Sequence, residues 1–151
     1  MRPGVPVAVV AALGLSAAAA GAAKSPSYNL LQGQEGFRGA IARIDSAQAK
    51  RMTGVSWRRG CPVPIRDLRV LTLSHWGFDR KVRTGRLIVR EDVARPVLGV
   101  FRELYAERFP IRRVVPVDAY DASDFRSIEA DNTSAFNCRY VDGTRRWSEH
   151  A

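Results

Sequence analysis

The chain has 151 residues, which is enough for one domain at most, and its apolar fraction of 46% allows a hydrophobic core. The net charge of +9 favours an anionic partner: a nucleic acid, a membrane surface or an acidic polymer of the cell envelope. The arginines are scattered along the chain, without zinc-finger spacing or an aromatic–basic RNA-binding signature. We therefore expect no nucleic-acid partner.

Residues 1–23 have the layout of a secretory signal peptide. Arg2 supplies a positive start, an apolar run follows as far as Ala20, and small residues continue to Ala23. The run is too short and too rich in alanine for a typical membrane span, so we expect no transmembrane segment after cleavage. An uncleaved anchor is the alternative. Either way, the following residues are predicted to be secreted or held in the cell envelope, with residues 24–35 as a linker.

The first half of the remaining chain predicts a helix followed by a hairpin. Apolar residues recur at helical steps, at Phe37, Ile41, Ile44 and Ala47. They indicate an amphipathic helix over residues 37–54, and residues 55–64, with their glycine and prolines, indicate a loop. Residues 68–76 (LRVLTLSHW) predict a buried strand, residues 77–85 a turn, and residues 87–89 a short returning strand.

The second half predicts one long helix and two further strands. An apolar stripe runs through Val93, Val97, Phe101, Leu104 and Tyr105. It indicates a helix over residues 91–109 with acidic residues at its beginning. Strands are predicted over residues 111–117 and 133–139. Asp118, Asp121 and Asp124 lack calcium-loop spacing and are interpreted as turn residues. This order of elements predicts an α+β domain with a small, mostly antiparallel sheet and packed helices.

Two cysteines, Cys61 and Cys138, fit an exported chain. An even number of cysteines in an oxidising compartment favours a disulfide between them, and two separate buried thiols are the alternative. The two cysteines and the two histidines are too widely spaced along the sequence to match a structural zinc site.

The last residues carry the strongest functional signal. Ser148-Glu149-His150 matches the opening of the pattern S-x-H-x-x-G-x-A-x-D, in which the histidine is the first zinc ligand of a family of peptidases. The segment from Asp124 to Arg139 is similar to the segment that leads into this motif. Further similarity lies in Cys61-Pro62-Val63-Pro64, in Asp67-Leu68-Arg69 and in Ser74-His75-Trp76-Gly77-Phe78. Over residues 57–151 the chain thus resembles peptidase family M15, the zinc-dependent D-alanyl-D-alanine carboxypeptidases and dipeptidases.

This resemblance implies a fold of the Hedgehog and D,D-peptidase group and a zinc cofactor held in part by His150. It implies that Arg139 binds the substrate or stabilises the charge of the transition state, and that Ser148 lines the substrate pocket. The expected substrate is the stem peptide of peptidoglycan. For Arg139 the alternative is a surface arginine on a strand.

The motif's glycine, alanine and aspartate, a catalytic carboxylate and a last histidine would all lie beyond Ala151. We therefore expect residues 36–151 to be a partial peptidase domain, incomplete at its C-terminus and inactive alone, with residues after Gly143 poorly held. The alternative is a secreted basic module that binds anionic cell-wall polymer without cutting it.

Overall fold

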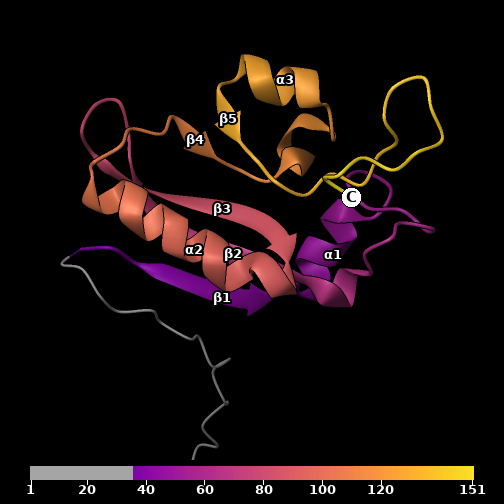
Figure 1. Ribbon diagram of the computed structural model, residues 1–151, viewed down its shortest axis with the longest axis horizontal. Helices are drawn as coiled ribbons and strands as arrows, with labels where there is room; N and C mark the ends of the chain where they lie inside the picture. The colour runs from indigo at the N-terminus through magenta and orange to yellow at the C-terminus, as the bar shows by residue number, and fades with distance from the viewer. Residues whose placement is uncertain (1–35) are drawn as a thin grey trace, which may run out of the picture.

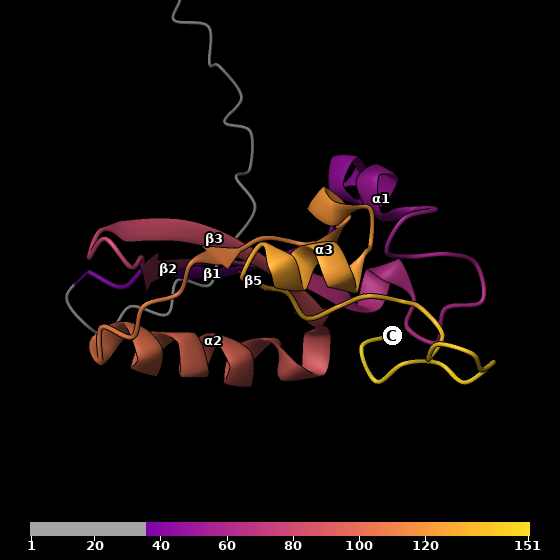
Figure 2. The ribbon, with the colours of Figure 1, turned by 90° about the horizontal axis from the view of Figure 1, so that it is seen from above.

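The computed structural model describes residues 36–151, so the predicted signal peptide and linker lie outside the described residues. Strands β1 (Gly39–Arg43), β2 (Leu68–Trp76) and β3 (Val82–Arg90) form an antiparallel sheet in the order β1-β2-β3. Helix α2 (Glu91–Ala106) lies along one face of this sheet (Figures 1 and 2). The predicted α+β class with a small antiparallel sheet is confirmed.

The β2–β3 hairpin is buried on both faces over half of its length. Leu71, Leu73 and Leu87 pack beneath α2, whereas Val70 and Ile88 pack on the opposite face of the sheet. Side chains alternate between the two faces of a strand, and here both sets find apolar partners. This arrangement explains why β2 carries apolar residues at both odd and even positions, as at Val70 and Leu71. The predicted strand over residues 68–76 is confirmed, and the predicted returning strand is longer than expected.

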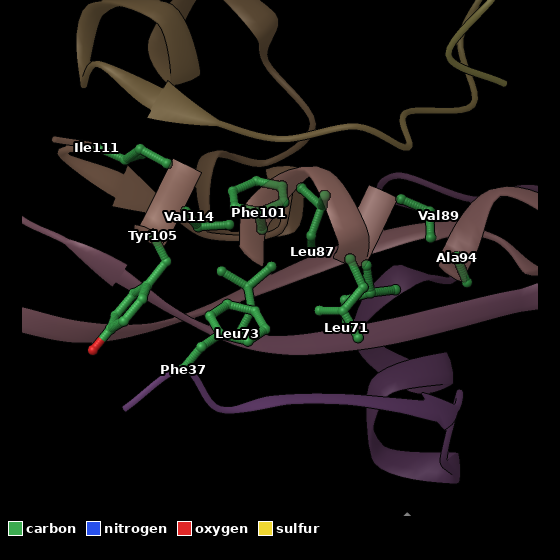
Figure 3. Packing of buried hydrophobic residues seen from close by; sticks show 11 residues of the cluster. Phe37, Leu71, Leu73, Leu87, Val89, Ala94, Phe101, Tyr105, Ile111 and Val114 are labelled. Atoms are coloured by element: carbon green, nitrogen blue, oxygen red, sulfur yellow. The ribbon is translucent and has the colours of Figure 1, made fainter. Parts of the chain in front are cut away.

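The main core lies between the sheet and α2, as Figure 3 shows. Leu98 and Phe101 of α2 are buried against Leu73 and Phe37 in this core. Gly39 allows α2 to pack closely on β1, because a Cβ added at this position would lie only 2.9 Å from Leu98 Cδ1. The predicted helix over residues 91–109 is confirmed, although it ends at Ala106.

A second core lies on the other face of the sheet, near helix α1 (Ser46–Met52) and a 3-10 turn at Ile65–Asp67. Met52 of α1 is fully buried there. Its buried members are Met52, Val63, Leu68, Val70, Ile88, Phe136 and Cys138. This core therefore joins the C-terminal part of the chain to α1 and the sheet.

The predicted helix over residues 37–54 is wrong in its first half. Residues 39–43 form β1, which pairs with β2 from Gly39↔Leu73 to Arg43↔Arg69, and the helix begins only at Ser46. Asp45 caps this helix by accepting a hydrogen bond from the Gln48 N–H (2.7 Å). The apolar spacing fits both a helix and a strand, and pairing with β2 decides between them.

The segment after α2 contains little regular structure. Strands β4 (Arg113–Val114) and β5 (Asn132–Thr133) form a short parallel pair, so both further strands are shorter than predicted. Between them lie a 3-10 turn at Val117–Tyr120 and helix α3 (Asp124–Glu129). Within residues 36–151, no helix has the length and apolar character needed to cross a membrane.

Candidate functional site

Residues 137–150 fold back on themselves as an antiparallel ribbon. The Asn137 N–H donates to His150 O (2.7 Å), the Ser148 N–H to Arg139 O (2.9 Å), and the Val141 N–H to Arg146 O (2.8 Å). An antiparallel β-bridge pairs Tyr140 with Trp147 in the same register. The rings of these two residues stack with centroids 4.1 Å apart. The expectation that residues after Gly143 are poorly held is therefore wrong: backbone bonds and a stacked aromatic pair hold them.

The ribbon places the predicted site residues at paired backbone positions, although Arg139 and Ser148 do not line the cavity beside His150. In its register Arg139 lies opposite Ser148, and Asn137 lies opposite His150. Arg139, Ser148 and His150 thus belong to one short piece of structure. The arrangement arises from pairing across the turn at residues 142–145, where Gly143 has a φ of 73°.

Arg139 is fixed by a carboxylate. Its Nε donates to Asp124 Oδ2, its Nη2 forms an ion pair with the same oxygen, and its Nη1 donates to Tyr140 O (3.1 Å). About a third of each of the two charged side chains remains exposed. A guanidinium has five N–H donors, so one donor on Nη1 and one on Nη2 remain for a ligand. Arg139 is therefore oriented by the protein and still able to bind an anion.

Asp124 acts as the common anchor of the ribbon. Its Oδ1 accepts a hydrogen bond from Asn137 Nδ2 (2.8 Å), while its Oδ2 contacts Arg139. Asp124 is the first residue of α3, whose N-cap Ser123 accepts a hydrogen bond from the Arg126 N–H. A carboxylate suits this position because the N-terminus of a helix favours negative charge. The start of α3 thus places Asp124 against Asn137 and Arg139, which alternate with Cys138 along the ribbon.

The sequence prediction that Asp124 is a turn residue is wrong, and its contact with Arg139 was not foreseen. Asn137 was also missed: it is buried, and its Nδ2 donates to Ala122 O (3.0 Å) as well as to Asp124. A signal for the helix start was present, because serine followed by an acidic residue is typical of a helix N-terminus. The spacing from Asp124 to Arg139, however, does not by itself indicate that the two side chains meet.

His150 is oriented by the backbone of the segment that precedes the ribbon. Its Nδ1 lies 2.9 Å from Ala135 O, a position in which an Nδ1–H donates to this carbonyl. In the tautomer that makes this bond, Nε2 carries the lone pair that a metal can bind. His150 lines a cavity of about 300 Å³ together with Val93 and Val97 of α2 and the neighbouring Glu149.

Ser148 is buried beside His150. Its Oγ accepts a hydrogen bond from the His150 N–H (3.2 Å), and its relative exposure is 8%. The hydroxyl hydrogen remains available to a second partner. Ser148 thus supports the backbone of His150 at the base of the ribbon.

Cys138, between Asn137 and Arg139, forms a disulfide with Cys61. The bridge joins residues that are 77 positions apart in the sequence. The Cys138 N–H also donates to Ser56 O (2.9 Å), and the Ser56 hydroxyl donates to Asp118 Oδ1 (2.5 Å). The ribbon is therefore attached covalently and by hydrogen bonds to the loop that follows α1.

The residues of the site do not form a metal centre by themselves. A catalytic zinc usually has three protein ligands. Residues 36–151 contain no group of three or more histidine, cysteine, aspartate or glutamate side chains placed to hold a metal. The other histidine, His75, is buried in β2, where its Nδ1 lies 3.4 Å from Trp76 O. His150 is thus an oriented imidazole without companion ligands among the described residues.

Comparison of the chain with protein-family models, with curated proteins and with solved structures finds no match. The resemblance to the zinc peptidases therefore stays an expectation that depends on the motif residues alone.

Proposed function

We propose that this chain provides one wall of a zinc-dependent peptidase site that acts on stem peptides of peptidoglycan. The observation that carries the proposal is the fixed guanidinium of Arg139, which Asp124 orients in the same ribbon as Ser148 and His150. These are the residues to which the S-x-H motif and its lead-in assign substrate binding and metal binding. Export by the predicted signal peptide would bring the protein to such a substrate.

The role proposed for Arg139 is to bind a carboxylate or a developing oxyanion. Asp124 already neutralises part of its charge, but one N–H on Nη1 and one on Nη2 remain for a ligand. Two parallel donors match the two oxygens of a carboxylate, and such paired bonds are strong and directional. The C-terminal carboxylate of a D-alanyl-D-alanine peptide is a ligand of this kind.

The role proposed for His150 is that of one zinc ligand through Nε2, with Nδ1 held on Ala135 O. A metal-bound histidine typically donates its other N–H to such an acceptor, which fixes the direction of the ring. One imidazole is too few ligands for a catalytic zinc, so the remaining ligands and the general base would have to come from groups other than residues 36–151. We therefore assign no reaction step to the metal and expect this chain to be inactive alone.

Peptide binding tests the role of Arg139 independently of catalysis. We expect Arg139→Lys to raise the Kd for an acylated D-alanyl-D-alanine peptide about tenfold, because lysine keeps the charge but loses the paired donors. Arg145→Lys is the matched control, since Arg145 is exposed in the turn of the same ribbon. The C-terminally amidated peptide should bind wild-type protein as weakly as the acid binds the variant. Equal binding of acid and amide would contradict the proposal.

Zinc content and peptide hydrolysis test the enzyme assignment. Both should be low for this chain and high for a longer product of the same gene, if one supplies the further ligands. A longer product without zinc or activity would contradict the peptidase proposal and favour a basic module that binds anionic cell-wall polymer.

A further inference from the structure

A second cavity lies at the tip of the β2–β3 hairpin. This tip lies at the opposite end of the sheet from the ribbon (Figures 1 and 2). Its volume is about 330 Å³. Its lining consists of the hairpin tip and the residues that follow α2: Trp76, Gly77, Phe78, Arg80, Arg108 and Pro110. The proposed peptidase site uses none of these residues.

Hydrogen bonds and aromatic stacking hold Trp76 in the wall of this cavity. The Trp76 Nε1–H donates to Tyr105 O at the end of α2 (2.9 Å), and its ring stacks on Tyr105 with centroids 5.4 Å apart. The Ile111 N–H donates to Trp76 O (2.7 Å), which ties the chain after α2 to the end of β2. The cavity therefore has a rigid floor made by two elements that are distant in sequence.

Arg80 occupies a position in the hairpin that normally favours glycine. The Arg80 N–H donates to Gly77 O and the Gly77 N–H to Lys81 O, each at 2.9 Å, so residues 78–80 form a three-residue loop. The last residue of such a loop adopts the left-handed conformation, and Arg80 has a φ of 59°. A side chain other than glycine is unfavourable there.

Arg108 occupies a second position of the same kind, just after α2. The Arg108 N–H donates to Tyr105 O (3.1 Å) and the Phe109 N–H to Leu104 O (2.9 Å), the two bonds that define a Schellman helix end. Glycine is the usual residue at this position because its φ is positive, and Arg108 has a φ of 53°. Two arginines in place of expected glycines thus line one cavity.

The positive charge of this cavity is not balanced by the acidic residues around it. Arg83 binds Asp79 (3.0 Å) and Arg112 binds Asp131 (3.0 Å), whereas neither Arg80 nor Arg108 forms an ion pair within residues 36–151. The guanidinium of Arg108 lies 5.5 Å from the centre of the Trp76 ring. Interaction with this ring and with the helix dipole explains why a cation stands at position 108. Neither interaction explains the arginine at position 80.

We propose that this cavity binds an anionic group carried on a sugar unit of an acidic cell-wall polymer. A pair of arginines binds carboxylate or phosphate through several N–H donors. The side chain of Phe78, which is 60% exposed and has the Arg112 guanidinium 5.1 Å from its ring centre, provides apolar surface for the sugar. The volume is suited to one such unit rather than to a long segment. A nucleobase is a poorer ligand, because Tyr105 and Arg108 already occupy the Trp76 ring.

Replacing both arginines by glycine tests this proposal and also removes the unfavourable positive φ of a non-glycine residue at each position. For the intact protein with Arg80→Gly and Arg108→Gly, we expect the Kd for polygalacturonate and for a polyribitol phosphate to rise at least about tenfold. The two polymers distinguish carboxylate from phosphate as the bound group. The Tm should be unchanged or higher, because glycine is favoured at both positions.

The matched control is Arg58→Gly with Arg59→Gly, which removes the same charge from two exposed residues that do not line the cavity. An equal loss of binding in both double variants would reduce the effect to net charge and overturn the proposal. Equal binding of neutral dextran, or tighter binding of poly(dT), would also overturn it. Binding is measured without hydrolysis, so the result does not depend on whether the peptidase proposal holds.

Discussion

The two ends of the sheet use arginine in opposite ways. At the ribbon, Arg139 is held by the carboxylate of Asp124 and by a backbone carbonyl, so its remaining donors have a fixed direction. At the hairpin tip, Arg80 and Arg108 have no acidic partner within residues 36–151 and extend from backbone positions that favour glycine. An anchored cation suits one ligand group in one geometry, whereas cations without a carboxylate partner can adjust to an anionic group in several orientations.

The attachment of the two regions differs as well. The ribbon depends on a disulfide and on side-chain bonds to Asp124. The hairpin cavity depends on the main core, through Trp76 and Tyr105. Changes to the ribbon should therefore leave the hairpin cavity intact, and the first of three experiments tests this separation, while the other two each examine one region.

Removal of the disulfide should have the largest effect. For Cys61→Ala with Cys138→Ala we expect the free energy of unfolding to fall by about 4–5 kcal/mol, because the bridge closes a long loop in the unfolded chain. Urea denaturation measures this change. In the native state, hydrogen exchange should become faster at Arg139 Nε–H and stay unchanged at Trp76 Nε1–H. Equal acceleration at both groups would show that the two regions are not independent.

Removal of the charge of Asp124 should have a smaller effect. We expect Asp124→Asn to lower the free energy of unfolding by about 1–2 kcal/mol, less than for a buried charged bond because the pair is partly exposed. Asp121→Asn is the matched control, since Asp121 forms an exposed ion pair with Arg126 (2.8 Å), and it should change stability by less than about 0.5 kcal/mol. A larger loss for Asp121→Asn would contradict the role of Asp124 as the anchor.

The smallest effect concerns Asp79 at the hairpin tip. The hydrogen bond from Arg83 holds the pKa of the Asp79 carboxyl below its usual 3.8. Since the folded pKa is the lower one, this bond stabilises the protein above the unfolded pKa and is lost as the pH falls through the folded pKa. Carboxyl NMR titration should show this depressed pKa and its return toward 3.8 in Arg83→Gln. An unchanged pKa in the variant would assign the shift to another group.

Local sequence pattern predicted the elements that are held by their own apolar faces. The strand over residues 68–76 and the helix from Glu91 were foreseen because their burial follows a simple period. The strand at residues 39–43 was not foreseen, since its pairing with β2 is a contact between distant residues. The same reason explains the short β5: the N–H groups of Phe136, Asn137 and Cys138 donate to three different segments instead of one strand.

The candidate site was predictable only in part. Arg139, Ser148 and His150 were proposed as site residues from the motif, and that role stays a prediction, whereas the carboxylate that orients Arg139 was not foreseen. The meeting of Asp124 with Arg139 depends on where α3 begins and on the register of the ribbon. Neither is encoded in local periodicity. The arginines at positions 80 and 108 were likewise invisible, because a positive φ at a non-glycine residue leaves no signature in composition.

Strand β1 has a consequence for the behaviour of the protein in concentrated solution. It is an outer strand of the sheet, and no strand within residues 36–151 pairs with its outer edge, which can therefore offer backbone groups to a strand of another molecule. Exposed arginines stand at both ends of this short strand, Arg38 just before it and Arg43 as its last residue. Antiparallel pairing of two copies would bring these like charges opposite one another. The two arginines thus act as gatekeepers that discourage edge-to-edge aggregation.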